Sequence, residues 1–146
     1  ACSVGTHTRT MELWVIILGV VVLVVIVAAL AKKPINDITT SFDDPPKYIL
    51  DKPSSRYPTK FMEEQKRRHP FIKTQQFDVA PSALFQIAKN LCESLAWEVV
   101  KVDESTGRIQ AVAITRIMRF RDDVVVRISP GANPNVSIVD MRSKSR

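Results

Sequence analysis

The sequence predicts an α+β domain that follows one N-terminal transmembrane helix. One observation is an apolar run of nineteen residues, Leu13–Ala31, without a charged, amide or hydroxyl side chain. The other is a change of hydrophobic period after this run, from helical spacings of three and four to a spacing of two from Trp97 onward. We therefore expect a small antiparallel sheet of two hairpins, packed on one or two helices.

The apolar run is long enough to cross a bilayer. At about 1.5 Å of rise per residue it reaches about 28 Å, close to the thickness of the hydrocarbon core. A cleaved signal peptide would have a shorter apolar run and a small-residue cleavage site, and a buried core helix is the third alternative. We predict a transmembrane helix over 13–33, with Trp14, Lys32 and Lys33 as anchors at the membrane interface.

The charges around the span predict its orientation. Lys32 and Lys33 follow it, whereas Arg9 is the basic residue before it, so the positive-inside rule places the C-terminal domain on the cytoplasmic or stromal side. Residues 1–12 are expected to be a tail or leader remnant. Met11 is a candidate natural start within it.

Residues 34–58 are rich in proline and are predicted to form an extended tether. Proline removes a backbone donor and fixes φ, so we expect neither helix nor sheet here. Tyr48, Ile49, Leu50 and Tyr57 make the segment too apolar for a free linker. The tether is therefore expected to pack along its own domain or along a neighbouring subunit.

The α+β domain is expected to cover residues 59–146 and to begin with a short helix over 59–68. Thr59 is the expected cap, and Pro70 follows the end of the helix. The basic cluster Lys66–Arg68 either complements the helix dipole or contacts lipid or a partner.

A second helix is predicted from Pro81, which suits a first helical position. Its apolar residues recur at spacings of three and four and are expected to form one stripe toward the core: Leu84, Ile87, Ala88, Leu91 and Leu95. Cys92 lies beside this stripe and is expected to be a small core residue without reactivity.

The first predicted hairpin joins Trp97–Asp103 to Arg108–Thr115 through a turn that ends in Gly107. Two alternatives for its inward face remain open. Either Val100 and Val102 face inward with Ile109 and Ala111, or Trp97 and Val99 face inward with Val112 and Ile114.

The second predicted hairpin joins Val124–Ser129 to Val136–Arg142. A symmetric closure pairs Ser129 with Val136, which places Asp123 opposite Arg142. The face expected to belong to the core consists of Val124, Val126 and Ile128 with Met141, Val139 and Ser137.

The other face of this hairpin carries Asp123, Arg127, Asp140 and Arg142. We interpret these four residues as a ladder of ion pairs that fixes the strand register. The alternative is an anion or partner site that uses Arg127 and Arg142. No pair of carboxylates suited to acid–base catalysis and no nucleophile with an adjacent base is visible in the sequence, so we do not expect an enzyme.

The charge pattern and the few cysteines and histidines argue against several classes of ligand. The net charge of +6 is spread over interleaved bases and acids with few aromatic residues among them, which argues against nucleic acid. Cys2 and Cys92 lie on either side of the span, so no disulfide framework is expected. His7 and His69 have no companions at ligand spacing. We therefore expect no metal, no cofactor and no small-molecule substrate.

Four stretches carry a resemblance to a known family: DITTSFDDPPKY, LAWEVVKVDESTGRIQA, FRDDVVVRI and VDMRSKSR. Over roughly 37–146 the chain resembles the bacterial and plastid family of uncharacterised domains numbered 1499. The resemblance implies a small α+β domain, often with a signal or anchor at its start, and no established activity. Members usually continue past the last stretch into a final helix, and we expect a partner protein to be a candidate for covering that sheet edge here.

We expect a non-catalytic single-pass accessory or assembly subunit of a larger membrane complex, photosynthetic or respiratory. Its partners would be other subunits of that complex and the lipid bilayer, in a bacterial inner membrane or an organelle membrane such as the thylakoid. The alternative is a module that binds lipid headgroups or small anions through Arg116, Arg119, Arg127 and Arg142.

Overall fold

The computed structural model describes residues 35–50, 57–114 and 119–146. The predicted span 13–33, its anchors Trp14, Lys32 and Lys33, and the tail 1–12 lie outside the described residues. Within the described ranges, no helix combines the length and the apolar character needed to cross a membrane. The chain divides into two compact units, and the folded domain is the second, Ile35–Arg146.

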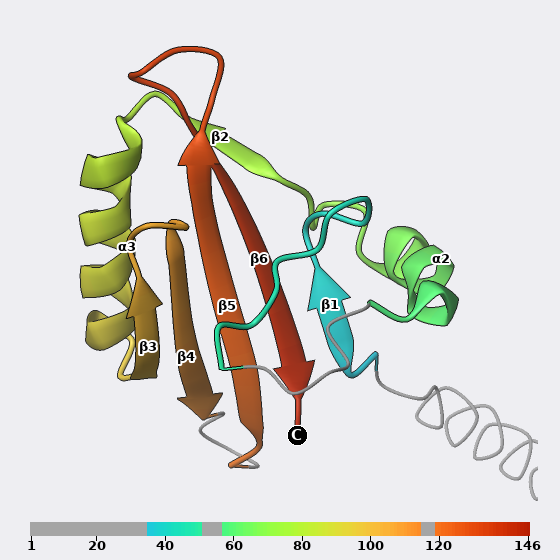
Figure 1. Cartoon of the computed structure of the whole chain (residues 1–146). Helices are drawn as coiled ribbons and strands as arrows, with labels where there is room; N and C mark the ends of the chain where they lie inside the picture. The colour runs from blue at the N-terminus through green and yellow to red at the C-terminus, as the bar shows by residue number, and fades with distance from the viewer. Residues whose placement is uncertain (1–34, 51–56, 115–118) are drawn as a thin grey trace, which may run out of the picture. The chain divides into compact units, whose positions relative to one another are not determined.

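The domain is built on a six-stranded antiparallel sheet (Figure 1). Along the sheet the strands follow the order β1-β6-β5-β4-β3, and β2 also pairs with β6. The strands are β1 (Asp37–Thr39), β2 (Gln75–Phe77), β3 (Glu98–Asp103), β4 (Arg108–Ile114), β5 (Arg121–Pro130) and β6 (Ser137–Ser145). The helices are α2 (Thr59–Arg68) and α3 (Pro81–Ser94). The α+β class is confirmed.

The sheet is larger than the two predicted hairpins. Strands β4 and β5 also pair, which joins both hairpins into one meander, and β1 and β2 pair with β6. Both added strands are three residues long. Strands this short carry too little alternation to be recognised from a hydrophobic pattern.

Helix α3 packs on one face of the sheet and forms the core with it. The buried cluster consists of Phe85, Cys92, Ile109, Val124, Val126 and Ile128. The prediction of a small core cysteine is confirmed, but the predicted inward stripe is wrong at three positions. Ile87, Leu91 and Leu95 are 54%, 54% and 52% exposed. The helix is instead rotated so that Phe85, which has more apolar area to bury than any of the three, faces the sheet.

Neither alternative for the inward face of the first hairpin is fully right, because β3 contains a β-bulge. The register shifts between Val99 and Lys101, so Val99 pairs with Ala111 but Val102 pairs with Ile109. One extra residue reverses the alternation of a strand. Val102, Val99 and Trp97 therefore all pack against the core cluster, whereas Val100 is 40% exposed.

The predicted register of the second hairpin is wrong by two residues. Ser129 lies opposite Ile138, and Asp123 lies opposite Lys144, not opposite Arg142. The connecting loop is 131–136, closed by a 2.8 Å hydrogen bond from the Gly131 N–H to the Val136 carbonyl, because Pro130 still belongs to β5. A shift by two keeps each side chain on its face. The predicted core face is therefore confirmed for Val124, Val126 and Ile128, with Val139 and Met141 packed against them.

Helix α2 has the predicted bounds, but Thr59 is not its cap. The N-cap residue is Pro58, and no side chain caps the helix there. The basic cluster Lys66–Arg68 forms ion pairs with Glu63 and Glu64 one turn earlier.

Candidate functional site: the polar face of the sheet

Residues 40–50, here called the strap, run across the sheet face that α3 leaves open (Figure 1). Two backbone donors near its end, the Ile49 and Leu50 N–H groups, donate to Gln110 Oε1 at 2.7 and 2.9 Å. The Tyr48 hydroxyl donates to the Asp123 carbonyl at 2.9 Å. The described part of the predicted tether thus packs on its own domain. The expectation of no sheet is wrong at Asp37–Thr39, which lie between Pro34 and Pro45 and pair with β6.

A buried ion pair ties the start of this segment to the sheet. Asp37 accepts two hydrogen bonds from Arg142, at 2.8 Å from Nε and 2.7 Å from Nη2. The exposed fraction of the side chain is 3% for Asp37 and 0% for Arg142. The guanidinium carbon lies 5.3 Å from the ring centre of Tyr48 and 6.0 Å from that of Tyr57. Arg142 is therefore inaccessible to a dissolved anion.

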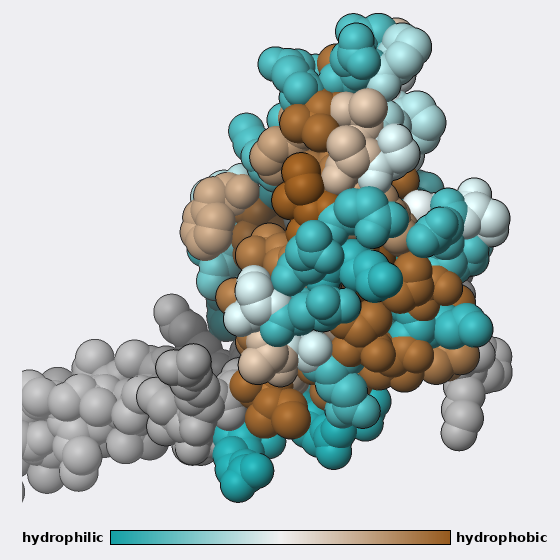
Figure 2. Space-filling view, turned by 90° about the vertical axis from the view of Figure 1, so that its left-hand side faces the viewer, coloured by the Kyte–Doolittle hydropathy of each residue, from teal (hydrophilic) through white to brown (hydrophobic). Residues whose placement is uncertain are grey.

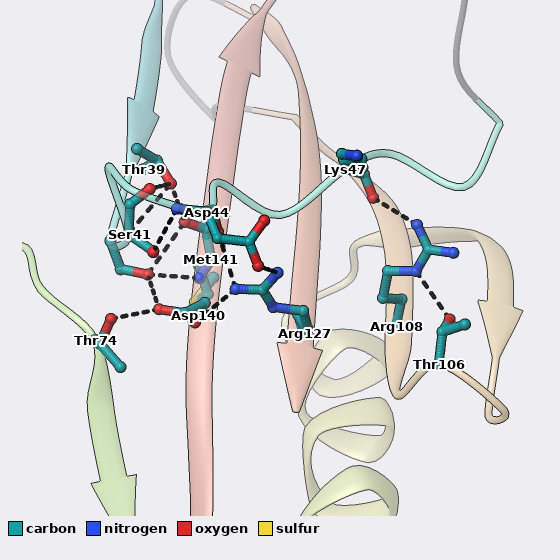
Figure 3. Close-up of polar contacts among 11 residues, drawn as sticks. Thr39, Ser41, Asp44, Lys47, Thr74, Thr106, Arg108, Arg127, Asp140 and Met141 are labelled. Atoms are coloured by element: carbon teal, nitrogen blue, oxygen red, sulfur yellow. Dashed lines mark hydrogen bonds and ion pairs between the residues drawn. The ribbon is translucent and has the colours of Figure 1, made fainter. Parts of the chain in front are cut away.

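Arg127 clamps the strap at its middle (Figure 3). It forms ion pairs with Asp44 of the strap at 2.7 Å and with Asp140 of β6 at 2.9 Å. Burial disfavours the charged guanidinium, but the hydrogen bonds and charges of Asp140 and Asp44 outweigh burial and raise the pKa of Arg127. Its Nε is the one buried side-chain atom that lacks a hydrogen-bond partner among the described residues.

Asp140, the cross-strand neighbour of Arg127, has a structural role. It is 4% exposed and accepts hydrogen bonds from the hydroxyls of Thr40 and Thr74 as well as from Arg127 (Figure 3). Three donors from three segments therefore stabilise one carboxylate, which is how a buried charge is tolerated. The predicted ladder is correct for this pair.

Gln65 of α2 closes the sheet edge at β1. Its side-chain amide donates to the Thr39 carbonyl at 2.6 Å and accepts from the Thr39 N–H at 3.1 Å, as a neighbouring strand would. The Tyr57 hydroxyl donates to the same Oε1 at 2.8 Å. Burial, and next the charge of Asp37, raise the pKa of Tyr57 to about 12. The exposed backbone edge that invites aggregation is thereby covered.

Asp123 pairs with Arg146 and not, as predicted, with Arg142. The carboxylate accepts hydrogen bonds from Arg146 at 2.7 and 2.9 Å, and this pair raises the pKa of Arg146. A cavity of about 400 Å³ lies beside it, lined by Tyr48, Leu50, Val100, Gln110, Lys144 and neighbouring residues. The Asp123 carboxylate neutralises the Arg146 guanidinium, whereas Lys144 in the same lining forms no ion pair among the described residues.

The β3–β4 turn holds a second polar cluster. Asp103 accepts hydrogen bonds from the hydroxyls of Ser105 and Thr106, both at 2.6 Å, and these bonds lower the pKa of Asp103 to about 2. Gly107 ends the turn at φ +64°, and an added Cβ would collide with the Ile128 carbonyl. The hydroxyls are thus engaged in holding the turn.

The charged side chains on the polar face of the sheet connect segments of the chain through ion pairs. Asp123, Arg127, Asp140 and Arg142 all form ion pairs with named partners. The described part of the chain contains no group of three His, Cys, Asp or Glu side chains placed to hold a metal. Arg119 is exposed and lies just before the start of β5, and Arg116 lies outside the described residues. The three described arginines of the alternative anion site, Arg119, Arg127 and Arg142, therefore do not share one open pocket.

Sequence reasoning did not identify Asp37, Asp44 and Gln65 as partners in this network. Asp37 lies in a segment assigned to the tether, and its signal was a carboxylate next to β-branched residues between Pro34 and Pro45. Gln65 lies inside a highly charged helix, where nothing in the sequence distinguishes it from exposed neighbours.

The comparisons with known proteins agree with the resemblance found in the sequence. The family model described as "Protein of unknown function (DUF1499)" matches residues 37–146. This range begins at the first residue of β1, so the family unit includes the strap as well as the sheet. No curated protein and no solved structure matches the chain. The chain belongs to the DUF1499 family of proteins of unknown function.

Proposed function

We propose that this protein is a non-catalytic, single-pass membrane accessory or assembly subunit of a larger protein complex. The anchor is the apolar run Leu13–Ala31, and the domain 35–146 is the part that binds other subunits. A photosynthetic or respiratory complex is the proposed setting. The charged side chains on the polar face of the sheet pair with one another and stabilise the domain. This supports a role in binding over a role in catalysis.

The observation that carries the proposal is the exposed apolar flank of α3, which consists of Ile87, Leu91 and Leu95. These residues are spaced four apart, so they form a continuous row along one side of the helix. Figure 2, which views the α3 side of the molecule, shows hydrophobic residues exposed on this side. More than half of each side chain is open to water, and covering it would contribute about 1 kcal/mol per residue.

The sheet face that α3 covers carries further apolar residues that are not fully buried. Phe77 of β2 is 44% exposed and pairs with Ser137, which alternation places on the face of Val139 and Met141. Val139 and Met141 are themselves only partly buried. An apolar helix or strand of a partner would find a surface of several residues here, which is larger than scattered surface leucines provide.

The lipid-headgroup or small-anion alternative receives less support at the residues first considered for it. Arg142 is fully buried against Asp37, and Arg127 is clamped between Asp44 and Asp140. A dissolved phosphate would have to displace carboxylates that are already in place.

The test is a native gel of mildly solubilised membranes, with mass spectrometry locating the chain among the bands. We expect the wild type to migrate with a large complex at fixed stoichiometry. The variant Ile87→Lys with Leu91→Lys should migrate alone, because it places two charges in the interface. Gln86→Lys, on the opposite flank of α3, is the matched control and should stay in the complex. A wild-type chain that runs alone would contradict the proposal.

A further inference from the structure

We propose that the end of the sheet where β1 begins and β6 ends docks onto the anionic headgroups of the membrane that holds the anchor. The inference rests on the anchor of the proposed function and adds a lipid-binding surface to it. It uses the exposed residues Ile114, Arg119 and Phe120 and the partly exposed Lys144, none of which the ion-pair network described above contains.

The backbone connects the apolar run to the sheet at this end. The Asn36 carbonyl accepts a 2.8 Å hydrogen bond from the Ser145 N–H, and Asp37 pairs with Lys144, so the chain joins the fold at this end of the sheet. Four residues, 32–35, separate Asn36 from the apolar run that ends at Ala31. Fully extended, this connection spans at most about 18 Å. The end of the sheet at Asn36 is thus held within a short distance of the headgroup layer.

Two exposed apolar residues, Ile114 and Phe120, lie at the same end of the sheet. Ile114 ends β4 and pairs with Arg121 at the start of β5, and the next residue, Asp122, pairs with Ser145 at the end of β6, so the end of β4, the start of β5 and the end of β6 lie at one end of the sheet (Figure 1). Ile114 is 47% exposed and Phe120 is 53% exposed. An exposed aromatic next to basic residues is typical of a segment that lies in the membrane interface.

Basic residues also gather at this end of the sheet. Four described cations lie at this end: Arg119, Arg121, Lys144 and Arg146. Arg121 and Arg146 are paired with Glu98 and Asp123, and Asp122 also lies here. Arg119 and Lys144 have no ion pair among the described residues, and Lys32 and Lys33 precede the fold in the sequence. Anionic lipid attracts such cations within about a Debye length of its surface.

The test uses the full chain, reconstituted into vesicles of phosphatidylcholine with phosphatidylglycerol. Phe120→Cys carries an environment-sensitive fluorophore, in a Cys2→Ser background in which Cys92 is buried and unreactive. Ala132→Cys, exposed in the β5–β6 loop at the opposite end of the sheet, is the matched control. Spin-labelled lipids should quench the label at position 120 several-fold more than the label at position 132.

A second set of measurements tests whether the basic residues contribute to membrane binding. In vesicles of phosphatidylcholine alone, or in the variant Arg119→Glu with Lys144→Glu, quenching at position 120 should fall toward the level at position 132. Equal quenching at both positions in anionic vesicles would overturn the proposal, and so would quenching that is independent of anionic lipid. The vesicles contain no other protein, so these outcomes do not depend on whether the chain binds a larger complex.

Discussion

Replacing Asp37 by alanine would remove the carboxylate that accepts two hydrogen bonds from the buried guanidinium of Arg142. The two side chains are 3% and 0% exposed and share two short hydrogen bonds. The nearby carboxylates on the same face are engaged elsewhere, Asp140 by Arg127 and Asp123 by Arg146. A guanidinium keeps its charge even when buried, so it cannot escape the penalty by losing a proton.

The expected cost is large for a domain of this size. Removing one partner of a buried ion pair lowers the free energy of unfolding by about 3 to 5 kcal/mol. Domains of this kind are stable by about 5 to 15 kcal/mol in total. Asp37→Ala therefore removes at least about a fifth of the stability, and the strap, which follows β1 directly, should loosen with it.

The assay is urea unfolding of the full chain in detergent, followed by the fluorescence of Trp97, which packs against the core cluster. Trp14→Phe removes the second tryptophan from all variants. Glu98→Gln is the control, because it breaks the ion pair with Arg121 that is 64% and 51% exposed, and it should cost less than about 1 kcal/mol. Equal effects of Asp37→Ala and Glu98→Gln would refute the reasoning.

Two further predictions concern the core and the alkaline limit of stability. Phe85→Ala should lower the free energy of unfolding by about 3 to 5 kcal/mol, whereas Leu91→Ala, on the same helix but 54% exposed, should cost less than about 1 kcal/mol; equal losses in urea unfolding would contradict the observed rotation of α3. An ultraviolet titration should show Tyr57 ionising at about 12, and Tyr57→Phe should remove that step. Because the folded-state pKa is raised above the ordinary value of 10.0, the stabilisation is complete below pH 10 and is lost as the pH rises through about 12. Ionisation of both tyrosines near 10 would contradict the buried hydrogen bond to Gln65.

The sequence predicted the elements of this domain better than their rotation and pairing. The bounds of α2, the start of α3, the two hairpins and the core face of β5 followed from period, proline and turn residues. The buried face of α3 did not, because leucines at spacings of three and four on one flank competed with Phe85 and Cys92 on the next. Tertiary packing decides such a contest, and no single-chain pattern contains that information.

The polar network shows a similar limit. Strand alternation placed Asp123, Arg127, Asp140 and Arg142 on one face, as the structure does. The partners of Arg142 and Arg127 could not be deduced, because Asp37 and Asp44 come from a segment far away in the sequence. A register error of two residues was enough to exchange the partners while it left the face unchanged.

Site-specific photo-crosslinking in intact membranes tests the central claim most directly. A photoreactive residue at position 91, on the apolar flank of α3, should form a discrete adduct with one neighbouring subunit. The same residue at position 93 replaces an exposed glutamate on the opposite flank and should form none. Adducts at neither position, or the same diffuse pattern at both, would contradict a binding role for this surface.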